Sequence, residues 1–526
     1  MLCKKLLSAV AGVTFVLAAG GAGATAFETD VTTSIDKGIE WLATAGAYNN
    51  PSSAGEAAGL TLLALLEKRP GANLNAAPQG YSGANATDQG RMRKSVAYII
   101  SQLNFVPFDL SYRDGASAMA LSLYLRTGGL DRGADPDLPA ALPYDLKGAI
   151  NKIFDRLKTY QLASGYWCYG PSYPNCNDSS TTQFVVAGLA GMRSVYGDTG
   201  KPWADATRLA ALDAMAAKAR AGYVANGTLS LASSACGNLG GGERGHGYNA
   251  GNTPTLQQTG SGTWIQIVGG ADINDASVQG YLKWLRNRYR YSNLGGAGAG
   301  WSSYWYYLWT TSKAMLFLRA AGVAPAAGNI GVNDIGTLPS GSAPVCGERE
   351  VHRNPATDAR VALFGAGAAG FYAGQPTDFY YDFAYEIMRR QQASGQYTDN
   401  FGSSSWNTYS RQSYALLVLQ RSVGGGCVDA NKNGICDSEE GNEGAPILLC
   451  DANSDGNVTS SDLNAIYALI RRDGPVTSVP ATPANSWANY ASTGASANTI
   501  DVNDFWQCYY VARGMLPKKY VGSVPD

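Results

Sequence analysis

A run of acidic and amide residues near the end of the chain has the spacing of a calcium-binding loop. In such a loop, oxygen-bearing side chains occupy positions 1, 3 and 5, glycine occupies position 6, a backbone carbonyl serves at position 7 and a carboxylate occupies position 12. The glycine permits a sharp turn, and these oxygens are the hard ligands that Ca²⁺ prefers. The alternative is an Asx-rich surface turn that binds no metal. The residues at these positions are Asp451, Asn453, Asp455, Gly456, Asn457 and Asp462.

A second run with the same pattern lies just upstream, between two cysteines. A disulfide between Cys427 and Cys436 would hold this loop in shape, and bound Ca²⁺ would stiffen it. Without metal its clustered carboxylates repel one another, and the alternative is a flexible acidic linker. The run resembles a thrombospondin type 3 calcium repeat, which implies a calcium-binding linker over 423–445. Its expected ligands, the fourth through a carbonyl, are Asp429, Asn431, Asn433, Ile435 and Glu440.

Candidates for acid–base chemistry lie in a long Gly-rich insertion between Cys236 and Thr263. Long irregular insertions in a compact domain often bind ligands. Glu243, Arg244 and His246 could supply a base, a clamp for an anion and an acid. The alternative is a Gly-rich loop that carries solvated charges.

Two aspartates, Asp114 and Asp178, are expected at the starts of buried helices. Carboxylates that meet across one cavity could cleave a polysaccharide. Aspartates at these positions are also ordinary helix N-caps, whose side chains accept backbone N–H groups. The sequence leaves both interpretations open.

The stretch 147–196 shows how the elements around these candidates are built. Its first half spaces Ile150, Ile153 and Phe154 along one helical face, with charged residues on the other. In its second half, residues 183–190 are apolar or small nearly all round, and such a helix must be enclosed. It is too short to cross a bilayer. We therefore expect an inner helix that an amphipathic outer helix screens from water.

Related helix pairs follow one another along the chain and predict an all-α fold. Their period of about fifty to sixty residues is too irregular for an open solenoid. Because repeated hairpins must bury their faces against neighbours, we expect the array to close on itself. The six expected pairs are 35–41 with 54–66, 92–103 with 114–125, the two halves of 147–195, 209–223 with 263–268, 278–289 with 302–318, and 379–392 with 405–421.

Two turn motifs resemble the QW repeat of squalene and terpene cyclases. Gln161 and Trp167 bound the sequence QLASGYW, and Gln391 and Tyr397 bound QQASGQY, with tyrosine in place of tryptophan. In that family and in prenyltransferase-like repeats, such motifs tie helices together at the turns of an α/α toroid. The resemblance implies a toroid over 27–422, with an unrelated helical bundle as the alternative. It implies no particular activity, because one fold hosts many functions.

The calcium-loop pattern near the C-terminus resembles a type I dockerin repeat, because an amphipathic helix is expected to follow it at 463–472. A degenerate second half at 499–505 keeps carboxylates at positions 9 and 12 but lacks ligands at positions 1, 3 and 5. We expect little or no metal there. The resemblance implies a dockerin-like domain over 446–526 that docks to a cohesin-like or other surface partner, with Ser460 and Ser461 contributing. The degenerate second half departs from ordinary cohesin pairing.

The N-terminal sequence predicts export. Lys4 and Lys5 precede an apolar run, and residues 24–26 offer a small-residue cleavage site, so we interpret 1–26 as a secretory signal peptide. No later segment is long and apolar enough to span a membrane. We expect a protein that is extracellular, attached to the cell surface or periplasmic.

Cysteine content fits this expectation. Removal of the signal peptide leaves eight of the nine cysteines, and exported proteins meet an oxidising compartment. Two pairs are suggested by short loops and two follow by elimination, although sequence cannot prove connectivity. The expected pairs are Cys168–Cys176, Cys427–Cys436, Cys450–Cys508 and Cys236–Cys346.

Composition narrows the function further. The formal net charge is −1 and only 15% of the 526 residues are charged, so the chain has no basic footprint for nucleic acid. The 31 Tyr and 11 Trp outnumber the 13 Phe, and aromatic residues with a polar group suit sugar-stacking surfaces and, equally, toroid turns.

Three hypotheses follow. The first is an exported calcium-binding scaffold or binding protein that holds a glycan or an apolar ligand while its dockerin-like module docks to a surface partner. The second is an extracellular polysaccharide-degrading enzyme, either a lyase or a hydrolase. The third, a terpene cyclase-like enzyme, is opposed by export and by the absence of the Asp-rich DxDD motif with which such cyclases protonate their substrates.

Overall fold

A computed structural model of the chain contains two compact units. The first comprises residues 1–196 and 201–426, and the second comprises residues 427–526 with the short segment 197–200. The residues that the structure describes are 25–69, 71–72, 77–131, 141–173, 176–227, 242–295, 303–338, 346–398, 407–425, 447–448, 450, 463–464, 479–480, 499–500, 502–513, 515 and 520–521.

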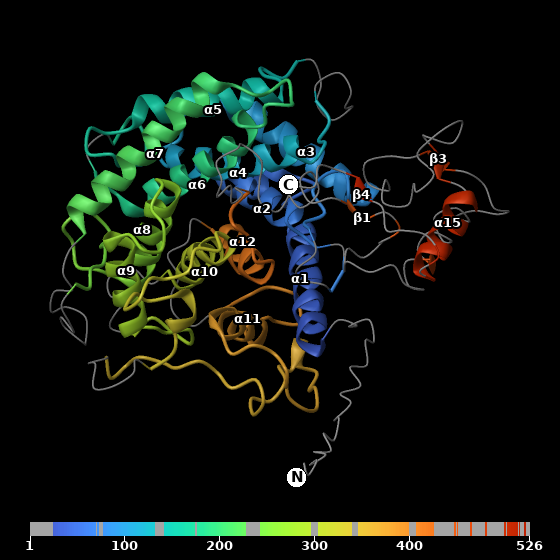
Figure 1. Ribbon diagram of the computed structural model, residues 1–526. Coiled ribbons are helices and arrows are strands. Elements are labelled where there is room, and N and C mark those ends of the chain that lie inside the picture. The colour runs from blue at the N-terminus through green and yellow to red at the C-terminus, as the bar shows by residue number, and fades with distance from the viewer. Residues whose placement is uncertain are drawn as a thin grey trace, which may run out of the picture. The chain divides into compact units, whose positions relative to one another are not determined.

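The first unit is built from helices, and the predicted all-α class is confirmed (Figure 1). All six predicted helix pairs are present, with boundaries that differ by up to nine residues. Short 3₁₀ turns lie at Pro51–Ser53, Gly55–Ala57, Val332–Asp334 and Leu363–Gly365. The helices are α1 (Ala26–Thr44), α2 (Ala58–Leu66), α3 (Ala86–Gln102), α4 (Leu110–Arg126), α5 (Leu146–Tyr160), α6 (Ser179–Tyr196), α7 (Ala206–Asn226), α8 (Leu256–Val268), α9 (Ala276–Asn287), α10 (Tyr304–Ala320), α11 (Phe379–Arg389) and α12 (Thr408–Leu419).

Helices α5 and α6 differ in burial as predicted, because α5 has one solvent-exposed face and α6 is buried almost completely. The side chain of Asp145 caps α5 by accepting the Gly148 N–H, and the helix buries the apolar face that contains Ile150 and Phe154. In α6 every residue except Arg193 is buried. The apolar and small residues of α6 therefore form a helix that neighbouring elements enclose.

Six helices of the first unit pack in a closed cycle. Helix α2 contacts α4, which contacts α6, and the series continues through α8, α10 and α12 back to α2. The remaining long helices pack outside it, as α7 does against α6 and α8 (Figure 1). Close approach within the cycle depends on glycine, because a Cβ at Gly115 would lie 2.3 Å from the carbonyl oxygen of Phe184.

The second QW-like motif joins the last hairpin to the first helix. Gln391 in the turn after α11 donates from Nε2 to the Ser34 carbonyl in α1 (2.9 Å) and accepts from Ser34 Oγ (2.8 Å). The Tyr397 hydroxyl also donates to the Ser34 carbonyl, at 2.9 Å. These contacts join segments more than 350 residues apart in the sequence, since Ser34 and Gln391 are separated by 357 positions.

The first QW-like motif, in the turn between α5 and α6, contacts helices that are close to it in the sequence. Gln161 donates from Nε2 to the Met215 carbonyl in α7 at 2.8 Å. Trp167 donates from Nε1 to the Leu157 carbonyl in α5 at 2.7 Å. Gln161 therefore links the α5–α6 turn to α7, and Trp167 links the same turn to α5.

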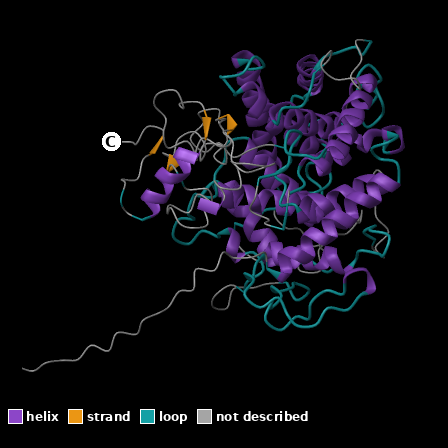
Figure 2. Ribbon diagram, turned by 90° about the vertical axis from the view of Figure 1, so that its right-hand side faces the viewer, coloured by secondary structure: helices purple, strands orange, loops and turns teal. Residues whose placement is uncertain are grey.

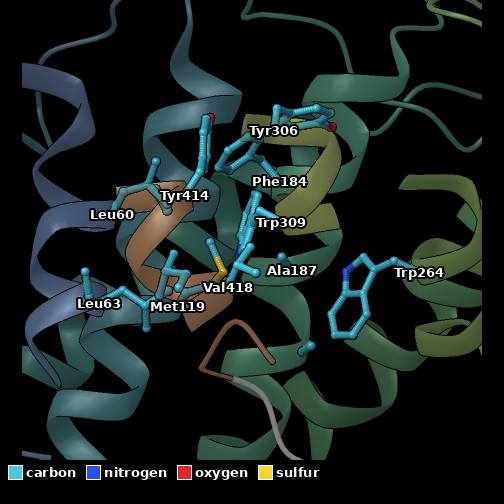
Figure 3. Packing of buried hydrophobic residues seen from close by; sticks show 14 of the residues in the cluster. Leu60, Leu63, Met119, Phe184, Ala187, Trp264, Tyr306, Trp309, Tyr414 and Val418 are labelled. Atoms are coloured by element: carbon cyan, nitrogen blue, oxygen red, sulfur yellow. The ribbon is translucent and has the colours of Figure 1, made fainter. Parts of the chain in front are cut away.

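The middle of the cycle is filled with side chains (Figure 3). Trp309 stacks on Tyr414 with ring centroids 5.1 Å apart, and Phe184 lies 5.3 Å from Trp309. Lys313 is fully buried between Trp264 and Trp309, and its amine has no hydrogen-bond partner among the residues described. Burial lowers the Lys313 pKa well below its usual value, because removal from water disfavours the charged amine.

The second unit is described only in short pieces. Strand β1 (Ile447–Leu448) pairs antiparallel with β4 (Tyr520–Val521), and β2 (Val479–Pro480) pairs antiparallel with β3 (Thr499–Ile500). Helix α15 (Val502–Ala512) follows β3. Figure 2 distinguishes these strands from the helices of the first unit. The residues predicted to bind calcium in both loops lie outside the described residues.

Two of the four predicted disulfides are present. Cys168 bonds to Cys176 and Cys450 bonds to Cys508, as the sequence predicts. Cys346 is also disulfide-bonded, whereas its predicted partner Cys236 and the pair Cys427–Cys436 lie outside the described residues. The two bonds are compatible with an extracellular protein. Of the predicted signal peptide, only the last two residues are described, and they lie at the start of α1.

No helix in the described part of the chain has the length and apolar character needed to cross a membrane.

Candidate functional site

A cavity of about 620 Å³, hereafter the aromatic cavity, opens at the N-terminal ends of α4, α6, α8 and α10. Tyr112, Gln258 and Tyr306 are each the third residue of their helix, and Asp109 and Asp178 each precede one. The remaining lining comes mostly from loops. The complete set is Phe108, Asp109, Tyr112, Tyr169, Tyr173, Cys176, Asp178, Ser180, Tyr248, Asn249, Gln258, Ser303, Tyr306 and Tyr414.

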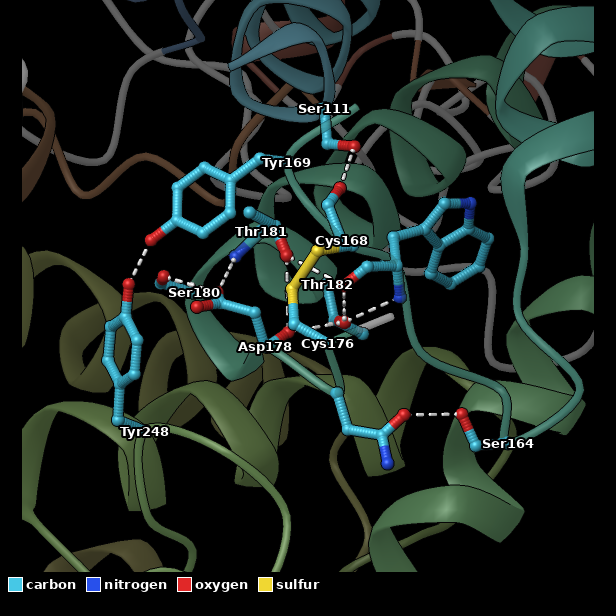
Figure 4. The surroundings of a disulfide bond; sticks show 12 residues. Ser111, Ser164, Cys168, Tyr169, Cys176, Asp178, Ser180, Thr181, Thr182 and Tyr248 are labelled. Atoms are coloured by element: carbon cyan, nitrogen blue, oxygen red, sulfur yellow. Dashed lines mark hydrogen bonds between the residues drawn. A yellow bond between two sulfur atoms is a disulfide. The ribbon is translucent and has the colours of Figure 1, made fainter. Parts of the chain in front are cut away.

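Asp178 has two carboxylate oxygens in different situations (Figure 4). Its Oδ1 caps α6 by accepting the Thr181 N–H at 2.8 Å and the Ser180 hydroxyl at 2.6 Å. Its Oδ2 is buried and has no well-formed hydrogen bond to any residue that the structure describes. The predicted N-cap is therefore present, and one oxygen of the same carboxylate remains for another donor.

Burial determines the titration of Asp178. The side chain is completely buried, and burial raises its pKa above the ordinary value. Hydrogen bonds from Ser180 and Thr181, together with the nearby Tyr248 hydroxyl, oppose that rise, because they favour the charged form.

Aromatic side chains surround this carboxylate. The hydroxyls of Tyr169 and Tyr248 hydrogen-bond to one another, and the Tyr112 hydroxyl hydrogen-bonds to Ser180. Phe108 stacks on Tyr169 with ring centroids 5.1 Å apart. The Cys168–Cys176 disulfide closes the loop that carries Tyr169, so covalent structure fixes one wall of the cavity (Figure 4).

Two amide side chains add further unpaired polar atoms. Asn249 Oδ1 and Gln258 Oε1 are buried and have no hydrogen-bond partner within the described parts of the chain. The described lining contains no lysine, arginine or histidine. The aromatic cavity therefore presents acceptor oxygens and aromatic faces.

A second, smaller cavity of about 240 Å³ lies between α2, α3 and α4 and is lined in part by Glu56 and Arg113. The Glu56 carboxyl faces the carboxyl of Asp109, which lines the aromatic cavity. Burial and this neighbour raise the pKa of Glu56 to about 7. Neither Glu56 nor Asp109 is among the residues that the sequence singles out. Asp109 precedes a buried helix as Asp178 does, and that signal could have identified it.

Asp114 lies elsewhere. The prediction that it begins an inner helix is wrong, because α4 begins at Leu110 and Asp114 is its fifth residue. Its carboxylate accepts two hydrogen bonds from Arg156, at 2.6 and 2.7 Å, and also contacts Arg113. Asp114 is completely buried in this cluster and does not line the aromatic cavity.

The Gly-rich loop does not bring its charged residues together. Glu243 is buried against Arg288, with N–O distances of 3.0 and 3.1 Å, and accepts a hydrogen bond from Asn287. Arg244 instead donates to the Gly227 carbonyl at 2.9 Å. Glu243 is therefore held in a buried ion pair, which also contradicts the expectation of a solvated charge.

His246 is buried between aromatic rings. Its Nε2 lies 2.7 Å from the Tyr166 hydroxyl, its Nδ1 lies 2.7 Å from the Gly247 carbonyl, and its ring stacks on Tyr223. Because Nδ1 must donate to the carbonyl, Nε2 accepts from tyrosine in the neutral ring. Burial lowers the pKa of His246 to about 4, which keeps it neutral near pH 7. Neither His246 nor Glu243 lines the aromatic cavity.

A metal site is not formed by the described residues, among which no group of three or more His, Cys, Asp or Glu side chains could hold an ion. The chain matches no model of a known protein family and no curated protein. Function must therefore be inferred from the cavity and from the sequence patterns.

Proposed function

We propose that the first unit is an α/α toroid that binds a neutral carbohydrate chain in the aromatic cavity, and that the second unit is a calcium-binding docking module. The observation that carries the first part is the unpaired Oδ2 of Asp178 among tyrosine rings. The closed cycle of six helices and the contacts of Gln161 and Gln391 support the toroid.

The unpaired oxygens favour a ligand that is rich in hydrogen-bond donors. Asp178 Oδ2, Asn249 Oδ1 and Gln258 Oε1 each need a donor, because a buried acceptor without one costs about 1–3 kcal/mol. Water or sugar hydroxyls can supply it, whereas an apolar ligand would leave all three unpaired. An anionic ligand would be repelled by Asp178 and would find no cationic side chain in the described lining.

The aromatic side chains of the cavity can pack against the apolar faces of a sugar ring. A pyranose ring presents C–H groups on its faces, and a pocket with apolar walls and a few convergent polar groups orients such a ligand. Phe108 and Tyr173 at the cavity are 57% and 52% exposed, so their rings remain available for contact. A chain of sugars could therefore extend from Asp178 across these rings.

Binding of neutral oligosaccharides tests this proposal. We expect one of cellohexaose, xylohexaose, maltohexaose or mannohexaose to bind the full chain in calorimetric titration. Asp178→Asn should weaken that binding about tenfold or more, because a hydrogen bond to a charged group contributes about 1.5–3 kcal/mol. Asparagine also caps helices, so α6 should remain intact.

The matched control is Asp145→Asn, which changes the exposed N-cap of α5 in the same way, because Asp145 does not line the cavity. It should leave the affinity unchanged. Failure of all four sugars to bind, or equal losses in the two variants, would contradict the proposal.

The calcium module rests on the spacing of the two loops. The first begins at Asp451, immediately after Cys450, and the Cys450–Cys508 disulfide ties this point to α15. In the proposed role the first loop orders the module that docks to a cohesin-like or other surface partner, and the loop beginning at Asp429 stiffens the linker.

Removal of calcium should destabilise the second unit. At free calcium 100-fold above its dissociation constant, binding to one site contributes about 2.7 kcal/mol to unfolding free energy. Asp455→Ala should abolish one binding event in calorimetric titration of the full chain with CaCl₂. Asp501→Ala, in the half that lacks most ligands, should not, and the same calcium stoichiometry in wild type and Asp455→Ala would refute the assignment.

A further inference from the structure

Two carboxyl groups line the aromatic cavity and a third lies next to one of them, which is an arrangement that can transfer protons as well as bind a ligand. We propose that Asp109 and Asp178 hydrolyse a glycosidic bond of the bound chain, with Glu56 acting through Asp109 as a positioning residue that supplies its proton. This inference rests on the proposed carbohydrate binding. It assigns to this cavity one reaction, the hydrolysis of a neutral glycan.

The geometry gives the two aspartates different roles. Both line one cavity, and both directly precede inner helices, Asp109 before α4 and Asp178 before α6. Asp109 has a carboxyl partner in Glu56, and such a pair can share one proton because two adjacent negative charges repel. Among the described residues Asp178 has no carboxyl partner of this kind; Ser180 and Thr181 hold its Oδ1, and no described residue hydrogen-bonds to its Oδ2.

Hydrolysis by these groups balances without a further reactant. Asp109 gives the proton of the pair to the glycosidic oxygen as the bond from that oxygen to the anomeric carbon breaks. A water molecule forms the new bond to this carbon and gives a proton to Asp178 Oδ2. The products are two shorter chains, after which solvent takes the proton from Asp178 and returns one to the Glu56–Asp109 pair.

Elimination is disfavoured by the same surroundings. A lyase removes a proton next to a uronate carboxylate and needs a base and a group that neutralises this anion. Burial raises the pKa values of Tyr112, Tyr169 and Tyr248, so forming a tyrosinate base is costly. The described lining offers no cation for a uronate.

The environment of Glu56 predicts the pH dependence. The charged or titratable groups that face it are Asp109 and Arg113, which precede and belong to α4, and Tyr98 from α3. Because the pKa of Glu56 is raised to about 7, this carboxyl holds its proton below that pH and loses it above. Hydrolysis should therefore decline as the pH rises through about 7.

The experiment incubates the full, calcium-loaded chain with the four hexaoses and measures new reducing ends and shortened chains by chromatography. Asp178→Asn and Asp109→Asn should each slow cleavage about 10²–10⁴-fold, the usual contribution of an acid or base. Glu56→Gln should slow cleavage and move the decline near pH 7 towards acid by at least about one unit. Glu40→Gln, exposed on α1, should change neither rate nor profile.

The outcomes separate the two proposals. Cleavage that the two aspartate variants lose, with a pH profile that Glu56→Gln shifts, supports hydrolysis. Calorimetric binding without new reducing ends overturns hydrolysis and leaves carbohydrate binding intact. Cleavage that survives Asp109→Asn, or an unshifted profile in Glu56→Gln, overturns the assigned roles, and absence of any binding overturns both proposals.

Discussion

Replacement of Asp114 by alanine should lower the free energy of unfolding by about 3–5 kcal/mol. The carboxylate is fully buried, and Arg156 donates to both of its oxygens, at 2.6 and 2.7 Å. Arg113 is a further cation beside it. Alanine would leave two buried guanidinium groups without their shared anion, and an uncompensated buried charge is much more costly than the ion pair is stabilising.

Urea unfolding followed by circular dichroism measures this loss. The control is Asp155→Ala on α5, because Asp155 pairs with Arg208 at 3.3 Å while its side chain is 58% exposed. Exposed pairs contribute about 0–1 kcal/mol, so this variant should be close to wild type. Similar stability of the two variants would show that the buried cluster does not carry the expected energy.

Replacement of Gly395 by alanine should cost about 2–5 kcal/mol. Gly395 has φ of +91°, where a side chain costs about 1–2 kcal/mol. A Cβ here would also lie 2.2 Å from the Lys37 carbonyl oxygen in α1, and overpacking adds about 1–3 kcal/mol. The clash falls where the last hairpin meets the first helix.

Gly370→Ala separates the two contributions. Gly370 has nearly the same φ, +92°, but a Cβ there would have no atom within 4 Å. It should lose only the conformational part, about 1–2 kcal/mol. Thermal and urea unfolding of both variants give the difference, and equal losses would mean that contact with Lys37 contributes nothing.

Helical periodicity was sufficient to predict the twelve helices of the six pairs. The amphipathic face of α5 and the apolar surface of α6 reflect burial directly, so residue types alone locate them. The glutamines at 161 and 391 predicted turns that link helices, and both make such links. The position of Asp178 before an apolar run allowed either a cap or a catalytic carboxylate, and its Oδ1 does cap α6 by accepting the Thr181 N–H.

The cavity could not be predicted from periodicity. Tyr169, Tyr248 and Asn249 come from loops that have no regular spacing, and only the fold brings them next to Asp178. Glu56 lies in a stretch of small residues and gains its raised pKa from burial and from Asp109, neither of which is visible in the sequence.

In the Gly-rich loop the sequence suggested a site that the structure does not contain. Charged residues among glycines suggested either a catalytic set or solvated side chains. Glu243 and His246 are instead buried in separate partnerships, with Arg288 and with Tyr166. A long-range ion pair and an interior histidine leave no local signature, because their partners are distant in sequence.

The contact between Ser34 and Gln391 also constrains how the chain can fold. During synthesis α1 emerges first, and its partner follows only after 357 further positions. Closing so long a segment carries an entropic cost before any contact compensates for it, and such long-range contacts slow folding. Until Gln391 and the helix that follows it have been synthesised, α1 lacks the partners that cover its apolar face, so a fragment that ends before this hairpin leaves that face exposed.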